Sequence, residues 1–142
     1  MDAPAEKATS RVPCRVLFAD TDALGIVYYA NYLRYFEIGR AEFFREFVRP
    51  FPEYIAADQY LIVLEAHCAY KKPARYDQVL TIETTLGEVG RVRLRVDYAI
   101  RDPAGELLAE GYTTHTVTDS GGRVRRMPRE FTECLRRLAG EA

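Results

Sequence analysis

Apolar residues recur at helical spacing between positions 29 and 48. Five of them stand at offsets of 0, 4, 7, 11 and 15 residues: Tyr32, Phe36, Gly39, Phe43 and Phe47. This spacing places them on one face of a helix, whereas polar residues such as Arg34 and Arg45 lie mostly off that face. The pattern stops at Pro50 and Pro52. We therefore predict a helix over residues 29–48 that buries one side against a sheet.

The second half of the chain alternates apolar and polar residues with the period of two that is typical of β-strands. Four stretches read as strands: residues 61–70, 78–88, 92–101 and 107–119. The turns between them are short, which favours an antiparallel meander. A short strand at 14–18 precedes the helix, and Pro128 followed by residues 129–138 predicts a last short helix. The pattern as a whole indicates an α+β fold.

One core accounts for this pattern. The chain has 142 residues, 48% of them hydrophobic, which suits a single domain. Residues 1–11 are small, charged and aperiodic. We expect them to form a flexible N-terminal arm, and residues 12–142 to form the folded domain.

The charge balance gives no general affinity for polyanions. There are 20 lysines and arginines against 21 aspartates and glutamates, for a formal net charge of −1, so we expect no nucleic-acid partner. The chain has neither a bilayer-spanning apolar run nor a leading basic-then-apolar segment, which predicts a cytoplasmic protein without stable membrane insertion. Its three cysteines are too few for a disulfide framework, so we expect free thiols.

Several kinds of catalytic site are excluded by the residues present. The two serines, Ser10 and Ser120, lack the Gly-x-Ser-x-Gly frame of a nucleophile. His67 and Cys68 are adjacent, and neighbours on a strand point to opposite faces, so they cannot act as base and nucleophile. The histidines and cysteines match no zinc spacing, and no phosphate-cradling glycine-rich motif is present. We therefore predict a site without metal or cofactor.

Two carboxylates remain, in an irregular loop just before the predicted helix. Asp20 and Asp22 lie within residues 19–25. The free backbone N–H groups at a helix start, together with the positive end of the helix dipole, favour an oxyanion there. The spacing alone also allows a second interpretation, in which an aspartate only caps the helix or fixes the loop.

A family resemblance is carried by residues 18–33, which read Phe-Ala-Asp-Thr-Asp-Ala-Leu-Gly-Ile-Val-Tyr-Tyr-Ala-Asn-Tyr-Leu, with Glu37 and Arg40 following. This string resembles the signature of the 4-hydroxybenzoyl-CoA thioesterase branch of hotdog-fold enzymes, and is similar to the Tol-Pal-associated (YbgC-type) acyl-CoA thioesterases of that branch. Residues 70–77 are similar to the family's turn between its second and third strands. With the order of elements, the resemblance covers residues 14–138.

The resemblance implies a single hotdog domain, in which a curved antiparallel sheet wraps a long helix. It also implies that two subunits pair their sheets as a homodimer or a dimer-of-dimers tetramer, with active sites at the subunit boundary. The implied reaction is acyl-CoA thioester hydrolysis, with Asp22 as nucleophile or general base and the backbone N–H near Tyr29 polarising the thioester carbonyl. Asp20 is then a residue that stabilises the loop.

The chain departs from its relatives at two substrate-binding positions. Tol-Pal-type members often carry histidine where this chain has Tyr29, and a tyrosine there resembles the aryl-CoA enzymes. Glu37 occupies the position of an aspartate that contacts the substrate ring hydroxyl in the hydroxybenzoyl enzymes. The alternative is that Glu37 orients Arg40 or a backbone group of the helix, so both aryl and alkyl substrates remain open.

Arginines are the candidates for the CoA phosphates. Arg91 and Arg93 align near positions that meet the nucleotide in the aryl-CoA relatives, and further arginines cluster at 123–129. The alternative for these residues is a solvated sheet face and tail. Two other functions also remain open: a thioesterase acting on acyl carrier protein, and a non-catalytic acyl-thioester binding protein.

Overall fold

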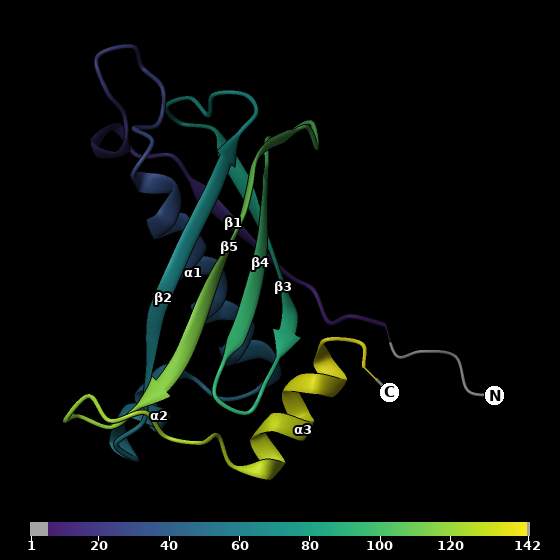
Figure 1. The fold of residues 1–142 in the computed structure, drawn as a ribbon. Helices are drawn as coiled ribbons and strands as arrows, with labels where there is room; N and C mark the ends of the chain where they lie inside the picture. Colours follow the sequence, from purple (N-terminus) through teal and green to yellow (C-terminus); the bar gives the residue numbers. More distant parts are fainter. Residues whose placement is uncertain (1–5, 142) are drawn as a thin grey trace.

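The computed structural model describes residues 6–141, so the first five residues of the predicted arm, and Ala142, lie outside it. A long helix lies against one face of a sheet, and two short helices lie toward one end (Figure 1). In chain order the elements are β1 (Ser10–Arg15), the 3-10 turn η1 (Phe18–Asp20), α1 (Asn31–Phe47), α2 (Phe51–Ala56), β2 (Tyr60–Tyr70), β3 (Val79–Val89), β4 (Leu94–Arg101), β5 (Leu107–Thr118) and α3 (Arg129–Leu138). The predicted α+β architecture, with its short C-terminal helix, is confirmed.

The sheet has the strand order β1-β3-β4-β5-β2, and every neighbouring pair is antiparallel. β3, β4 and β5 form the predicted meander, but β2 does not continue it beside β3. The connection at 71–78 instead carries the chain across the sheet and packs on the loop before α1, where Val27 N donates to Ala74 O at 2.9 Å. β2 is therefore an edge strand, with β5 as its only partner among the described strands.

The predicted apolar face of α1 forms the centre of the core. Four of its five residues are buried, and Phe47 is half-buried. Phe36 stacks on Tyr98 of β4 with ring centroids 4.3 Å apart. A Cβ at Gly39 would lie only 2.4 Å from Thr84 Oγ1 and 2.7 Å from Ile82 Cγ2. A glycine costs about 1 kcal/mol in a helix interior, and here it allows α1 to approach β3 closely.

Two element boundaries and one short helix differ from the prediction. β1 begins at Ser10, which pairs with Thr84, so the last two residues of the predicted arm are part of the sheet. Ala8 N also donates to Leu138 O at 2.8 Å. The short helix α2 was not predicted; Pro50 ends the α1 pattern and at the same time provides the fixed backbone that precedes a new helix. α1 itself begins two residues later than expected.

The cysteines are free thiols, as predicted. On β2, His67 is exposed while Cys68 packs against the core, which confirms that these neighbours face opposite sides. Among residues 6–141, none of the helices is long and apolar enough to cross a membrane.

Candidate active site

Asp20 organises the loop between β1 and α1. Its side chain is buried and accepts hydrogen bonds from Leu17 N and Tyr35 Oη, both at 2.9 Å, and from the Arg34 guanidinium. Burial, and the bond to Asp20, raise the pKa of Tyr35, which keeps its hydroxyl protonated as a donor. These three donors hold the carboxylate in place, which confirms that Asp20 stabilises the loop.

The backbone of Asp20 also decides where α1 begins. Its carbonyl accepts from Tyr28 N at 2.9 Å and from Asn31 Nδ2 at 2.8 Å. Asn31 N in turn donates to Tyr28 O, so residues 28–30 form a turn rather than the first helical residues. The N–H groups of Tyr29 and Ala30 have no hydrogen-bond acceptor within residues 6–141. Two backbone donors are therefore available at the start of the helix.

Asp22 lies at the exposed tip of the same loop. Its Oδ1 accepts from Leu24 N at 2.8 Å, and its carbonyl accepts from Gly25 N at 3.0 Å. Gly25 has φ +74, in the left-handed region that a glycine adopts without strain. The turn thus orients the carboxylate through Oδ1, while Oδ2 has no hydrogen-bond partner in the described part of the chain.

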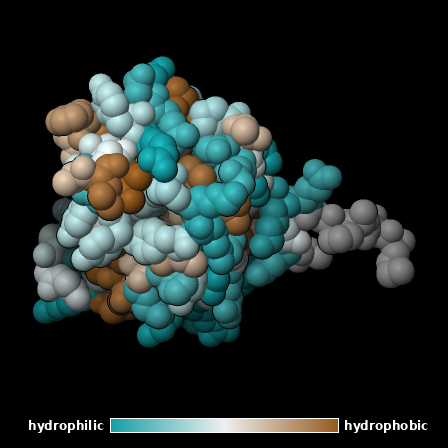
Figure 2. All heavy atoms as spheres, turned by 90° about the horizontal axis from the view of Figure 1, so that it is seen from above, coloured by the Kyte–Doolittle hydropathy of each residue, from teal (hydrophilic) through white to brown (hydrophobic). Residues whose placement is uncertain are grey.

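The loop, the helix start and the end of β2 meet at one place. Tyr29 is 62% exposed, and its carbonyl accepts from Tyr70 Oη at 3.0 Å. Burial raises the pKa of Tyr70 to about 12. Seen from this end, the surface carries apolar patches among hydrophilic residues (Figure 2), and Phe18 and Leu24 are each 77% exposed beside Asp22. The loop that carries Asp22 therefore leads directly into the turn that carries Tyr29, and exposed apolar side chains lie along it.

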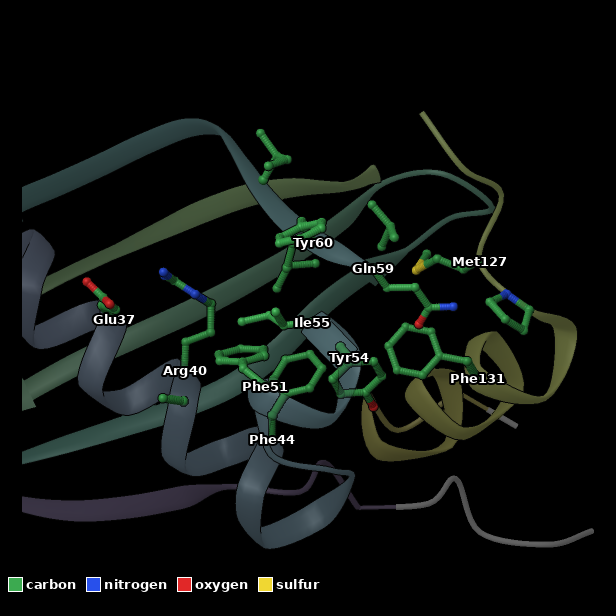
Figure 3. Close-up of a pocket in the computed structure, with 15 residues that line it drawn as sticks. Glu37, Arg40, Phe44, Phe51, Tyr54, Ile55, Gln59, Tyr60, Met127 and Phe131 are labelled. Atoms are coloured by element: carbon green, nitrogen blue, oxygen red, sulfur yellow. The ribbon is translucent and has the colours of Figure 1, made fainter. Parts of the chain in front are cut away.

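Glu37 lies elsewhere on α1, with Arg40, in a pocket of about 280 Å³ between α1, α2, β2 and α3 (Figure 3). At about 1.5 Å per residue, Glu37 is about 9 Å and Arg40 about 14 Å beyond Asn31 along the helix axis. Most of the pocket is apolar, and its aromatic side chains are Phe44, Phe51, Tyr54, Tyr60 and Phe131. Neither Asp22 nor Tyr29 of the same chain lines it. Sequence reasoning missed this pocket because α2 had not been predicted.

The two predicted CoA-binding arginines lie in the turn between β3 and β4 rather than on a strand. Gly90 N donates to Arg93 O at 2.7 Å, which closes this turn, and β4 begins only at Leu94. The period-two alternation in the sequence begins before β4 does, so it predicted a longer strand. Only Arg91 of the pair faces a hollow; Arg93 does not line it.

That hollow has a volume of about 390 Å³ and lies between the turn and α3. Four arginines line it: Arg91, Arg126, Arg129 and Arg136. Two of them are ion-paired, Arg129 with Glu133 and Arg136 with Glu141. Arg91 and Arg126 have no carboxylate within 4.0 Å among residues 6–141, so their charges are available to a phosphate. The cluster of arginines at 123–129 indicated part of this hollow in the sequence, because Arg126 and Arg129 belong to it.

The arginine hollow and the Asp22 loop lie at opposite ends of the sheet. The Asp22 loop packs on the connection that leads into β3, whereas Arg91 follows the far end of that 11-residue strand. At about 3.3 Å per residue, the strand separates them by roughly 33 Å. A single chain therefore does not place Asp22, the aromatic pocket and the arginines in one site.

Comparison with known proteins gives a consistent result. The thioesterase-like superfamily matches residues 16–135. An Aquifex aeolicus protein named as an esterase is 36% identical over 86% of this chain and 94% of its own length. The acyl-CoA thioester hydrolase YbgC of Escherichia coli O6:H1 is 32% identical over 70% of this chain and 75% of its own.

Solved structures show the same fold. A DHNA-CoA thioesterase from Staphylococcus aureus superposes with a TM-score of 0.86, at 22% identity, over 89% of this chain and 88% of its own. That identity is too low to carry more than the architecture. The expected hotdog fold is confirmed, and the superfamily match spans most of the described residues. The chain belongs to the thioesterase-like superfamily, a family of hotdog-fold enzymes.

Proposed function

We propose that this chain hydrolyses acyl-CoA thioesters to a carboxylic acid and free CoA, with Asp22 as nucleophile or general base. Two features of the connection between β1 and α1 support the proposal: the Asp22 carboxylate has one unpartnered oxygen, and the N–H groups of Tyr29 and Ala30, seven and eight residues further along, are unpaired within residues 6–141. These donors would polarise the thioester carbonyl and stabilise the oxyanion that forms on attack. Removal of one such donor typically costs about 2.7–4 kcal/mol of transition-state stabilisation.

Two copies of the chain would complete the site. β2 is 11 residues long, lies at the sheet edge and exposes Ile62, Val63 and Leu64 by 41%, 48% and 44%. An exposed apolar edge of this kind favours pairing with another strand. If two β2 strands pair antiparallel about their middle, Tyr70 of each chain lies beside Tyr60 of the other. Tyr70 touches Tyr29, and Tyr60 lines the aromatic pocket, so Asp22 of one chain would face the pocket of its partner.

This arrangement gives a role to Asp22, Tyr29, Glu37 and Arg91. Tyr29 contributes the oxyanion donor, and Glu37 of the partner subunit faces the acyl group. Arg91, with the arginines beside it, would bind the CoA phosphates through bidentate hydrogen bonds. Arg93, which lies outside the hollow, is a weaker candidate for this role. The oligomeric state, a homodimer or a tetramer, stays a prediction, and so does the cytoplasmic location.

The test of Asp22 is a substitution that keeps its turn. Asp22→Asn retains an oxygen for Leu24 N but removes the base, so turnover of acyl-CoA should fall at least about a hundredfold. Asp102→Asn is a matched control, because Asp102 Oδ1 accepts from Ala104 N at 2.9 Å in the same kind of turn. Equal rates for Asp22→Asn and the parent would refute the assignment, and a parent inactive on short, long and aryl CoA thioesters would favour a binding protein.

A single-turnover reaction in ¹⁸O-labelled water tests whether Asp22 is the nucleophile. Attack by Asp22 forms a mixed anhydride and releases CoA; if water then attacks the Asp22 carboxyl carbon, the acid takes its new oxygen from Asp22 and is unlabelled, a result that only a nucleophile gives. Water attack on the acyl carbon of the anhydride labels the acid. If Asp22 is a general base, the attacking water delivers ¹⁸O to the acid at once.

The turnover of one acyl group attached to CoA, compared with the turnover of the same group attached to acyl carrier protein, shows which carrier the enzyme uses.

Pairing through β2 is tested by Val63→Lys. A lysine at the centre of a dimer interface should yield a monomer in analytical ultracentrifugation, with loss of turnover. Val124→Lys is the control, because Val124 is 59% exposed and lies outside β2, bridged to Thr118 of β5. An active dimer in the Val63→Lys variant would show that the chains do not pair in this way.

A further inference from the structure

A buried chain of hydrogen bonds runs from α1 into the sheet behind the aromatic pocket. Arg40 Nη1 donates to Tyr98 Oη at 3.0 Å, Tyr98 Oη lies 2.6 Å from Thr113 Oγ1, and Thr113 Oγ1 lies 2.7 Å from His115 Nε2. Tyr98, Thr113 and His115 are each at most 3% exposed. A guanidinium can only donate. Tyr98 Oη therefore accepts from Arg40, and its bond to Thr113 continues the chain to His115.

The end of this chain is a neutral imidazole. Burial, and then the positive charge of Arg40, lower the pKa of His115 to about 3. His115 therefore stays uncharged at neutral pH and adds no second positive charge beside Arg40. Phe36 stacks on the Tyr98 ring from the helix side. These contacts hold one nitrogen of the Arg40 guanidinium in a defined position.

The remaining donors of Arg40 are unused. A guanidinium has five N–H groups, and Tyr98 is the only acceptor that Arg40 reaches within residues 6–141. Glu37, one turn earlier on α1, also lines the pocket but forms no ion pair with it in the described structure. Arg40 thus presents a held cation to a pocket whose other walls are mainly apolar (Figure 3). The ligand that suits such a donor is an oxygen acceptor on an otherwise apolar group.

We propose that Arg40 is a specificity-determining residue, which donates hydrogen bonds to an oxygen at the far end of the acyl group. It would do so for the thioester attacked by Asp22 of the partner subunit. This inference rests on the proposed function and the proposed pairing of β2. The oxygen can belong to a carboxylate or to a hydroxyl, and both are hydrogen-bond acceptors for a guanidinium.

Two matched pairs of substrates test the selectivity. Adipoyl-CoA and hexanoyl-CoA differ by a terminal carboxylate, and 4-hydroxybenzoyl-CoA and benzoyl-CoA differ by one hydroxyl. The ratio of kcat/KM within a pair is independent of the fraction of folded enzyme. The parent should prefer the oxygenated member of at least one pair, and Arg40→Gln should reduce that ratio about 10- to 100-fold, the range for a hydrogen bond to a charged group.

Three further variants show how Arg40 acts. Tyr98→Phe removes the hydrogen bond that holds the Arg40 guanidinium, and should lower the same kcat/KM ratio by a smaller factor than Arg40→Gln does. Arg40→Lys should retain part of the parent's preference. Arg45→Gln is the control, because Arg45 lies on the same helix, pairs with Glu42 and is exposed to solvent. An unchanged ratio in Arg40→Gln, or a parent without any preference, would overturn the role of Arg40.

A mixed dimer tests the placement across subunits. Asp22→Asn and Arg40→Gln chains, each with a different tag, should form a heterodimer with one intact site, and so about half the parental turnover of the preferred substrate. If both residues serve the same chain's site, the heterodimer has no intact site, and failure to recover turnover would refute the placement.

Calorimetric binding keeps this inference separate from the proposed function. The Asp22→Asn variant should bind the preferred thioester more tightly than its deoxygenated partner, and adding Arg40→Gln should abolish the difference. If the parent hydrolyses no thioester while Arg40→Gln still abolishes the selective binding, that result would refute only the hydrolysis and would leave the role of Arg40 standing. Equal binding of both members by Asp22→Asn would refute Arg40 selectivity whatever the turnover.

Discussion

Asp20→Asn tests whether the buried carboxylate holds the catalytic loop. Oδ1 of Asp20 accepts from Arg34, while Oδ2 accepts from both Leu17 N and Tyr35 Oη. The asparagine can keep its carbonyl oxygen on the two donors at Oδ2, and its NH₂ then faces Arg34. The ion pair is lost, and two charge-assisted bonds become neutral ones. The backbone carbonyl that fixes the start of α1 is unchanged.

The expected cost follows from these contacts. Each of the two bonds should weaken by about 1 kcal/mol, the difference between charged and neutral hydrogen bonds. Arg34 is 45% exposed and can turn into water, so the ion pair adds only about 0.5 kcal/mol. We expect a loss of about 2–3 kcal/mol in the free energy of unfolding, and a fall of several degrees in Tm.

The assay is urea unfolding at one fixed protein concentration, because subunit association would contribute to stability. Arg34→Gln is the matched variant: it removes the ion pair and the contact of the guanidinium with the Tyr35 ring, and should cost only about 1 kcal/mol. Turnover by Asp20→Asn should also fall, since the loop carries Asp22. If the unfolding free energies of Asp20→Asn and the parent agree within about 0.5 kcal/mol, Asp20 does not hold the loop.

Three other predictions concern stability. Gly39→Ala should destabilise the fold by about 1–3 kcal/mol in urea unfolding, because its Cβ would meet Thr84 and Ile82; a stabilised variant would contradict the close approach. Gly25→Ala should lower turnover with a loss of only about 1 kcal/mol, since its φ of +74 is strained for alanine but its surroundings are open. The pKa of His115 is lowered from 6.5 to about 3 in the folded protein, so between these pH values His115 is protonated in the unfolded chain but not in the folded one. Stability should therefore fall by up to about 1.4 kcal/mol per pH unit in that window, and His115→Gln should show a shallower pH dependence.

The long helix and the strands were predictable because their signals are local. The apolar face of α1 and the alternation in β4 depend only on residues a few positions apart, and each element is long enough to repeat its period. Element ends were less accurate. Neither the start of α1, set by the Asp20 carbonyl, nor the Arg91–Arg93 turn, closed by a bond from Gly90, has a signature in periodicity. α2 has six residues, too few to show a helical period.

The sequence by itself indicated an α+β fold without the residue spacings of serine or zinc sites, and the resemblance of residues 18–33 to a known family implied the hotdog fold and Asp22 as the candidate catalytic residue. Those conclusions rest on residue types, short-range spacing and that resemblance. Only the tertiary structure decided that β2 crosses to the edge beside β5 and that Arg40 ends a buried chain of hydrogen bonds. It also separated Asp22 from the aromatic pocket and the arginine hollow within one chain. These are consequences of contacts between residues far apart in sequence, whose partners are chosen by packing, and a linear pattern does not encode that choice.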